Sequence, residues 1–345
     1  MNGARDMSTR TTMLAVATLA CLLLSGAAPT FAAVQNMARS PYRGAIVVDA
    51  ATGKVLFERY ADTKGYPASV TKLMTLLVIL EAVDSHRLKL DDKVAVTREA
   101  AKIGGSQVYL QENEVFTVDE LLYALIVQSA NDAAVALAIH CAGSKAAFVK
   151  LMNARASELG MKSTVFHSVH GLPPGRGQLP DVSTARDIAI LSRAIVRKPL
   201  ALKYTSAKEY TLRAKEGKPF IMRSHNALLK RVPGCDGLKT GFFNAAGWSI
   251  AATATKDRQR AIAVVLGAAD QKVRDKKAKQ ILSEGLAQLA LNPPPPPPVT
   301  PPASGVVQIK TSTLKTAAFG AGGALLLGVV LFAVKRRTRP SAYMR

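Results

Sequence analysis

The chain has 345 residues, of which 48% are hydrophobic, and a formal net charge of +22 at pH 7. The hydrophobic share excludes a disordered chain, and the length allows one large domain with flanking segments. So basic a protein accumulates near polyanions, but the sequence has no nucleic-acid-binding motif and only 6% aromatic residues. We therefore expect no nucleic-acid partner, and consider other anionic polymers and lipid surfaces instead.

Residues 1–33 have the pattern of a signal peptide for export. Two arginines precede an apolar stretch, and small residues follow around Ala32, where we expect cleavage. Cys21, within the apolar stretch, only weakly resembles a lipoprotein cleavage site. The remainder would work outside the cytoplasm, where cell-wall polymer is the expected partner of the +14 charge on residues 34–292.

The first elements of the body are a β-hairpin and a buried helix. Two β-type runs, Gly44–Asp49 and Val55–Glu58, flank a short turn. The run Pro67-Ala68-Ser69-Val70-Thr71-Lys72 then leads into an apolar stretch long enough for a helix that Ser69 would open. There the helix dipole can hold negative charge near Ser69, and Lys72 projects from the same face. Taken alone, the pair also fits an N-cap followed by a solvated lysine.

The long middle, from Ser69 to about Pro199, is mainly helical in pattern. Helices are expected over Val118–Ile126 running into Ala133–Cys141, over Ser144–Leu159, and from the capping residues Ser183–Asp187 through Ile195. A second polar motif, Ser129-Ala130-Asn131, lies between the first two of these segments. It fits a pair of site residues, and equally a turn or an ordinary N-cap.

Strand patterns return in the last third of the body. They cover Lys208–Leu212, Gly237–Phe243, Gly247–Thr255 and Arg260–Gly267, and a closing helix follows from about Lys272 to Leu291. A third motif, Lys239-Thr240-Gly241, falls within the second strand. Strands at both ends with helices between predict an α+β fold, in which an antiparallel sheet packs against a mainly helical lobe and the motifs meet in the cleft.

The C-terminal end has the pattern of a tethered domain. Residues 293–315 form a Pro-rich linker, which polyproline geometry would make a stiff spacer. Residues 316–334 are uncharged and apolar, and nineteen helical residues nearly match a bilayer core of about 30 Å. Residues 335–345 form a basic tail that the positive-inside rule places in the cytoplasm. We expect a transmembrane helix with the 34–292 domain on the outer side of the cytoplasmic membrane.

The three motifs in this order closely resemble those of the low-molecular-mass penicillin-binding proteins, the serine D-alanyl-D-alanine carboxypeptidases. The similarity runs from about Ala45 to Leu291, and includes Val169-His170-Gly171-Leu172 and Asp236-Gly237-Leu238-Lys239-Thr240-Gly241. It implies the β-lactamase/transpeptidase-like fold, no cofactor, a periplasmic or equivalent location, and two ligand classes: peptidoglycan stem peptides ending in D-Ala-D-Ala, and β-lactams as covalent inhibitors. Many relatives carry a small all-β domain next; here the Pro-rich segment follows the catalytic part almost at once, and we expect no such domain between them.

The resemblance also implies roles for individual residues. Ser69 would attack the penultimate carbonyl, Lys72 would take its proton, and Ser129 would relay that proton to the leaving amine. A free lysine is protonated near neutral pH, so burial and the charge of Lys239 must lower the pKa of Lys72.

The remaining candidates would bind substrate. Asn131 would donate to an amide carbonyl, Thr240 would bind the terminal carboxylate, and Gly241 would let substrate approach the strand. The backbone N–H groups of Ser69 and Phe242 would form the oxyanion hole. Arg274 would pair with the substrate carboxylate, although a solvated basic helix face explains it equally well.

Several other functions and reactive residues fit parts of the same sequence. The segment His167–Asp181 has no glutamate that could deacylate a β-lactam acyl-enzyme, which argues against a β-lactamase. A D,D-endopeptidase that cuts cross-links uses the same residues and stays open, as does a catalytically inactive wall-binding protein. His167 and His170 lack a third ligand, so we expect no metal. Pairing of Cys141 with Cys235 is left undecided.

Overall fold

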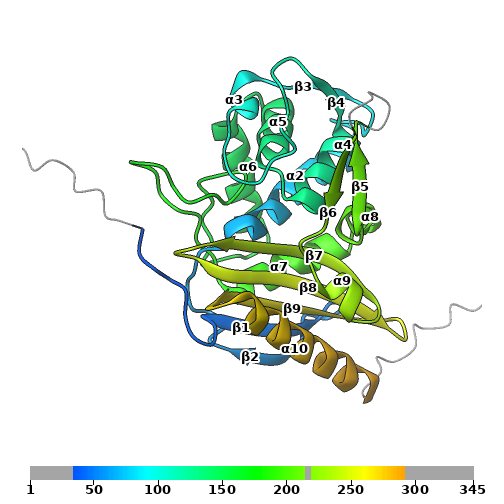
Figure 1. Cartoon of the computed structure of the whole chain (residues 1–345). Coiled ribbons are helices and arrows are strands. Elements are labelled where there is room, and N and C mark those ends of the chain that lie inside the picture. The colour runs from blue at the N-terminus through cyan, green and yellow to red at the C-terminus, as the bar shows by residue number, and fades with distance from the viewer. Residues whose placement is uncertain (1–33, 214–218, 292–345) are drawn as a thin grey trace, which may run out of the picture. The chain divides into compact units, whose positions relative to one another are not determined.

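The computed structural model describes residues 34–213 and 219–291 (Figure 1). The predicted signal peptide, Pro-rich linker, transmembrane helix and basic tail all lie outside these residues. Their boundaries therefore remain predictions, as does the end of the catalytic domain at residue 292.

One antiparallel sheet combines strands from both ends of the described chain. Its strands are β1 (Gly44–Asp49), β2 (Val55–Arg59), β7 (Cys235–Phe243), β8 (Gly247–Lys256) and β9 (Gln259–Ala268), in the order β2-β1-β9-β8-β7. The N-terminal hairpin joins the C-terminal strands where β1 pairs with β9, with Val47 opposite Ala263. This confirms the predicted hairpin and the predicted closure of the sheet by the two ends, and it makes β7 an edge strand.

Alternation along the strands gives the sheet two buried faces. On β9, Ile262, Val264 and Leu266 belong to the core shared with the helical lobe. Their neighbours Ala261, Ala263 and Val265 belong to the core under helix α10 (Gln271–Leu291). Because successive side chains point to opposite faces, one apolar strand can serve both layers. Figure 1 shows α10 lying along the sheet on the side away from the helical lobe.

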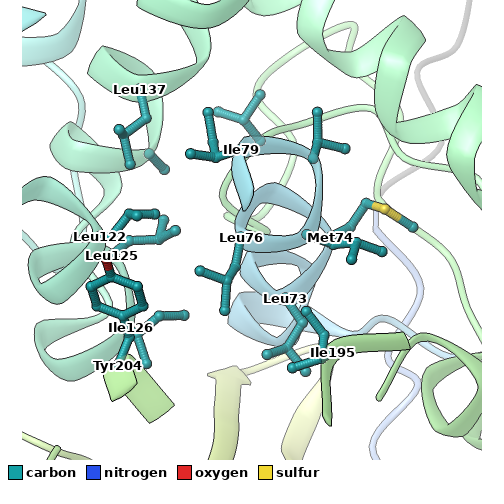
Figure 2. Close-up of a cluster of buried hydrophobic side chains, with 14 of the residues drawn as sticks. Leu73, Met74, Leu76, Ile79, Leu122, Leu125, Ile126, Leu137, Ile195 and Tyr204 are labelled. Atoms are coloured by element: carbon teal, nitrogen blue, oxygen red, sulfur yellow. The ribbon is translucent and has the colours of Figure 1, made fainter. Parts of the chain in front are cut away.

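Helix α2 (Lys72–Asp84) is the centre of the helical lobe. Ten of its thirteen residues are buried, so the helix is apolar around its whole circumference. In Figure 2, Leu76 of this helix points toward Leu125 and Ile126, and Leu73 lies beside Ile195. This packing holds the start of α2, which carries the first motif, firmly against the sheet.

Helix α9 (Leu228–Arg231) belongs with α10, since its Leu228 lies in the core under that helix. The other helical elements surround α2 in the lobe. They are the 3₁₀ turn η1 (Ala68–Thr71), α3 (Arg98–Ala101), α4 (Val118–Tyr123), the π-helical turn η2 (Ala124–Gln128), α5 (Asn131–Ala142), α6 (Lys145–Glu158), α7 (Ala185–Val196) and α8 (Pro199–Thr205). Two small antiparallel pairs complete them: β3 (Lys93–Ala95) with β4 (Val115–Thr117), and β5 (Glu209–Leu212) with β6 (Phe220–Arg223). The predicted caps are confirmed, since the Thr184 hydroxyl accepts from the Asp187 backbone N–H at the start of α7.

The structure differs from the sequence prediction in several places. The helix expected over Val118–Ile126 does not simply run on into the next one, because it loosens into η2 and ends at Ser129, whose φ of 62° is left-handed. Ser129 is not an N-cap, since Ala130 holds that position for α5. The strand expected at Lys208–Leu212 forms, but it pairs with β6 in a separate hairpin and not with the main sheet. Strands β3, β4 and β6 and helices α8 and α9 were not predicted.

Within the described ranges, no single helix is both long and apolar enough to cross a membrane. Only α5 and α6 together reach that length and composition, and they meet at a bend of 85°.

Candidate active site

The first motif forms a tight polar contact at the start of α2. Ser69 lies in η1, directly after Ala68, whose φ of 49° is in the left-handed region that residues other than glycine rarely adopt. The turn brings Ser69 Oγ to 3.0 Å from Lys72 Nζ. Lys72 is fully buried, so the alternative of a solvated helix lysine is wrong. The prediction that both side chains share one face is confirmed.

The Lys72 amine has three hydrogen-bond partners, and their chemistry can accommodate its neutral form. Besides Ser69 Oγ, it contacts Asn131 Oδ1 and the His170 carbonyl oxygen, each at 2.7 Å. The last two can only accept, so they take two N–H groups of the amine. A neutral amine has no third N–H and would turn its lone pair toward the Ser69 hydroxyl, which can donate.

Electrostatics favour this neutral form. Burial in the first place, and the positive charge of Lys239 in the second, hold the pKa of Lys72 well below its usual value of 10.5. The buried carboxyl groups of Asp181 and Asp132 act in the opposite direction but are the smaller influences. The expected lowering of this pKa, from the two expected causes, therefore agrees with the structure.

The second motif occupies the sharp connection between η2 and α5. The connection is fixed by two backbone bonds, from Ala130 N to Ala124 O at 3.0 Å and from Asn131 N to Ser106 O at 2.8 Å. The left-handed conformation of Ser129 costs on the order of 1 kcal/mol, so the surrounding structure must impose it. No hydrogen bond is formed by the Ser129 hydroxyl within the described parts of the chain, and it is free to meet a ligand.

Asn131 is placed differently from its predicted role. Its carbonyl oxygen accepts from Lys72, and its amide nitrogen donates to the Gly104 carbonyl at 2.7 Å. The side chain is buried and does not line the pocket described below. In this structure Asn131 therefore positions Lys72, and a direct contact with substrate stays a prediction.

The third motif lies on edge strand β7, which packs directly against η1. A Cβ atom added to Gly241 would lie 2.6 Å from the Pro67 carbonyl oxygen and 2.9 Å from the Ser69 backbone nitrogen. Only glycine allows this approach. Lys239 is buried and donates to the Thr240 carbonyl at 2.9 Å, and burial together with the charge of Arg274 lowers its pKa to about 7.

Arg274 enters the site from α10 and is 2% exposed. Its Nε and Nη2 donate to Asp275 Oδ1 at 2.9 and 2.7 Å, and the guanidinium lies 5.6 Å from the ring centre of Trp248. Trp248 in turn stacks on Phe242 at 3.9 Å, and Phe242 is 44% exposed. The alternative of a solvated basic face is wrong for Arg274, although it fits its neighbours on the helix.

These segments enclose one pocket of about 370 Å³. Six of the nine predicted site residues line it: Ser69, Ser129, Thr240, Gly241, Phe242 and Arg274. The other three, Lys72, Asn131 and Lys239, are buried. Sequence reasoning missed Ser106, His225, Trp248 and Gln271, which complete the lining. It also missed that the His170 backbone, not its ring, contacts Lys72.

The remaining reactive side chains in the described part of the chain are the possible metal ligands and the two cysteines. There, no three His, Cys, Asp or Glu side chains come together as a group that could hold a metal ion. Cys141 and Cys235 are both free thiols. Burial raises the pKa of each, which makes both poor nucleophiles.

Comparison with known proteins identifies the family. A family model described as D-alanyl-D-alanine carboxypeptidase, peptidase S11, matches residues 32–270. The chain belongs to this family. It is 38% identical over 251 residues to the D-alanyl-D-alanine carboxypeptidase DacF of Bacillus subtilis, a match that covers 73% of this chain and 64% of DacF. The chain thus spans slightly less than two thirds of that relative.

Solved structures confirm the predicted α+β fold. Penicillin-binding protein 6B from Escherichia coli matches with a TM-score of 0.66 at 35% identity, over 75% of this chain and 80% of that chain. Penicillin-binding protein D2 from Listeria monocytogenes, in its ampicillin-bound form, matches with a TM-score of 0.64 at 35% identity. This match covers 71% of this chain and 97% of that chain.

Proposed function

We propose that the protein is a serine-type D-Ala-D-Ala carboxypeptidase, which removes the terminal D-Ala from peptidoglycan stem pentapeptides through an acyl-enzyme on Ser69. The observation that carries this proposal is the buried Lys72 amine, 3.0 Å from Ser69 Oγ and hydrogen-bonded to two carbonyl oxygens. A base held in this way can accept the serine proton as the hydroxyl attacks. The family description and the name of DacF supply the substrate class.

In acylation, Ser69 Oγ bonds to the penultimate carbonyl carbon and its proton passes to Lys72. The C–N bond then breaks, and the leaving amine takes a proton through Ser129, whose hydroxyl is unpaired among the described residues. The backbone N–H groups of Ser69 and Phe242 would stabilise the oxyanion. Support for this role comes from Gly241, which lets the strand approach the Ser69 backbone. Water then hydrolyses the ester and restores Ser69.

Substrate orientation would come from the opposite wall of the pocket. Thr240 and Arg274 are the proposed partners of the terminal carboxylate, and both line the pocket. Arg274 is already oriented by Asp275 and Trp248, so little conformational entropy is lost on binding. Lys239, with a pKa of about 7, would add positive charge near the carboxylate and beside Ser129.

β-Lactams would acylate the same serine. Penicillin-binding protein D2 was solved with ampicillin bound, and we extend that binding to this chain. For location, we propose a signal peptide over residues 1–33, a transmembrane helix over 316–334, and a catalytic domain held on the periplasmic side of the inner membrane. The charge and hydropathy patterns of the sequence support this arrangement.

The experiment is D-Ala release from a soluble stem pentapeptide, with a cross-linked peptide dimer as the second substrate. A carboxypeptidase frees D-Ala from the pentapeptide faster than it cleaves the dimer, and Ser69→Ala abolishes release. Faster cleavage of the dimer would support the endopeptidase alternative. No turnover of either substrate by the folded protein would support the inactive wall-binding protein.

A further inference from the structure

A basic groove lies between helix α9 and the first half of α10. It has a volume of about 500 Å³, and four of its lining residues are cationic: Arg231, Lys272, Lys276 and Lys279. All four are exposed. The groove also contains Asp275, whose Oδ1 accepts from Arg274, so this single carboxylate offsets only part of the charge of the four cations.

The four cations have no internal partners. Across the described residues, none of their side chains forms an ion pair or a hydrogen bond, whereas Arg155, Arg213 and Arg260 each pair with a carboxylate. On α10, Lys272 and Lys276 are four residues apart and Lys276 and Lys279 three, spacings at which like charges repel and destabilise a helix. A cluster of unpaired cations in a concave surface has the character of an anion-binding site.

A second hollow extends the basic surface on the other side of α9. It has a volume of about 240 Å³, and its lining includes Lys208, Lys230 and Arg231. It also includes Asn226, which is buried and whose amide nitrogen has no hydrogen-bond partner among the described residues. The described residues leave this donor without an acceptor, and an anionic ligand would bring acceptors.

Both hollows adjoin the proposed active site. Gln271 lines the basic groove and the catalytic pocket, and His225 lines the second hollow and the catalytic pocket. Arg274 faces the catalytic pocket while its bonded neighbour Asp275 faces the groove. A chain that enters the catalytic pocket can therefore continue over Gln271 into a surface lined by ammonium and guanidinium groups.

We propose that the α9–α10 groove binds a linear, carboxylate-bearing polymer, namely the cell-wall strand whose peptide end occupies the catalytic pocket. This inference rests on the proposed function. The concave form of the groove favours an extended chain over a planar bilayer surface. Its cations would hold the polymer mainly through charge, so binding should weaken as salt rises.

The test compares two double variants with the same change in charge. The groove variant is Arg231→Glu with Lys276→Glu, one residue from each wall. The control is Lys93→Glu with Lys150→Glu, two exposed lysines without ion pairs, on β3 and α6 of the helical lobe (Figure 1). Binding of fluorescein-labelled poly-L-glutamate to the full chain is measured by anisotropy at two salt concentrations. Penicillin acylation of Ser69 is measured in the same samples.

The groove variant should bind poly-L-glutamate at least tenfold more weakly and with a smaller salt dependence, while the control changes by less than twofold. Penicillin acylation should be unchanged in both, which separates this test from that of the proposed function. Turnover of soluble uncross-linked peptidoglycan should fall in the groove variant, and turnover of a short D-Ala-D-Ala peptide should not. Equal losses in both variants would overturn the proposal in favour of non-specific attraction. If the groove variant bound anionic phospholipid vesicles more weakly but bound poly-L-glutamate normally, the proposal would be overturned in favour of a membrane contact.

Discussion

At the scale of single residues, the central feature is a buried lysine amine whose contacts accommodate its neutral form. Two of its contacts, Asn131 Oδ1 and the His170 carbonyl oxygen, accept only, which leaves the lone pair for the Ser69 hydroxyl. The charge of Lys239 supports this state because it lowers the pKa of Lys72. Lys239 is therefore expected to act on the base as well as on substrate.

This predicts a shift in the pH profile when the charge of Lys239 is removed. Lys72 is active when neutral, so acylation falls as pH drops through its pKa. In Lys239→Met that pKa rises, and the acid limb of the acylation profile should move to higher pH. The shift is measured from penicillin acylation rates between pH 5 and pH 9. Each unit by which the pKa of Lys72 moves corresponds to about 1.4 kcal/mol of interaction with the charge of Lys239.

Lys239→Arg is the matched control, because it keeps the positive charge. Its acylation is expected to be slower, since the larger side chain does not fit as well, but its acid limb should stay near that of the unmodified protein. If the acid limb of the acylation profile were the same in Lys239→Met and in the unmodified protein, the charge of Lys239 would not contribute to the low pKa of Lys72.

At the scale of elements, the site depends on the close approach of edge strand β7 to turn η1. The apolar packing of α2 fixes the turn, and pairing with β8 fixes the strand, with Thr240 opposite Ile250. The two meet at Gly241, where a Cβ atom would be 2.6 Å from a carbonyl oxygen. A shift of either element by a few tenths of an ångström would change the pocket.

We therefore expect Gly241→Ala to lower the rate of penicillin acylation by at least tenfold, because the methyl group forces β7 away from η1. Gly104→Ala is the control: an added Cβ there has no atom within 4 Å, and its φ is not positive. Stopped-flow or gel-based acylation rates compare the two. A Gly241→Ala protein with the unmodified rate would contradict the proposed contact.

A second connection between elements is made by Asp181, which ties the 167–171 loop to η1. Its carboxylate accepts from Thr71 Oγ1 at 2.9 Å, from Ser168 Oγ at 2.8 Å and from the backbone N–H groups of His167 and Ser168. The same loop presents the His170 carbonyl to Lys72. Asp181 thus supports the base from a distance.

Asp181→Ala should cost on the order of 2–3 kcal/mol of unfolding free energy, because it leaves buried donors without an acceptor. It should also slow acylation, since the His170 carbonyl loses its support. Urea denaturation measures the first effect. Asp91→Ala, an exposed aspartate whose side chain has no recorded hydrogen bond within the described ranges, should change stability by less than about 0.5 kcal/mol. Equal losses in both variants would exclude the proposed role.

At the scale of the whole molecule, the regular strands and helices were the elements that the sequence pattern predicted best. Strands β1, β2, β7, β8 and β9 and helix α10 lie where alternation and apolar runs predicted them. Their meeting in one sheet followed from strands at both ends of the body. The irregular parts could not be predicted, because η2 and the left-handed Ser129 depend on packing against neighbouring elements and have no local signal.

The residues of the site could be predicted from the sequence, but their burial and backbone contacts could not. The three motifs identified the residues that converge, since hydroxyls, amines and an edge-strand glycine have recognisable chemistry. Burial was not predictable from composition: Arg274 looks like its neighbours Lys272 and Lys276, yet it is enclosed by Trp248 and Asp275. The His170 contact was invisible because any residue has a backbone carbonyl.

The most direct test of the account is mass spectrometry of the intact, folded protein after reaction with a penicillin. We predict one stable adduct, on the peptide that contains Ser69, which disappears in Ser69→Ala and forms much more slowly in Lys72→Arg. Absence of an adduct, an adduct on another residue, or a near-normal acylation rate in Lys72→Arg would contradict the claim that Lys72 activates Ser69.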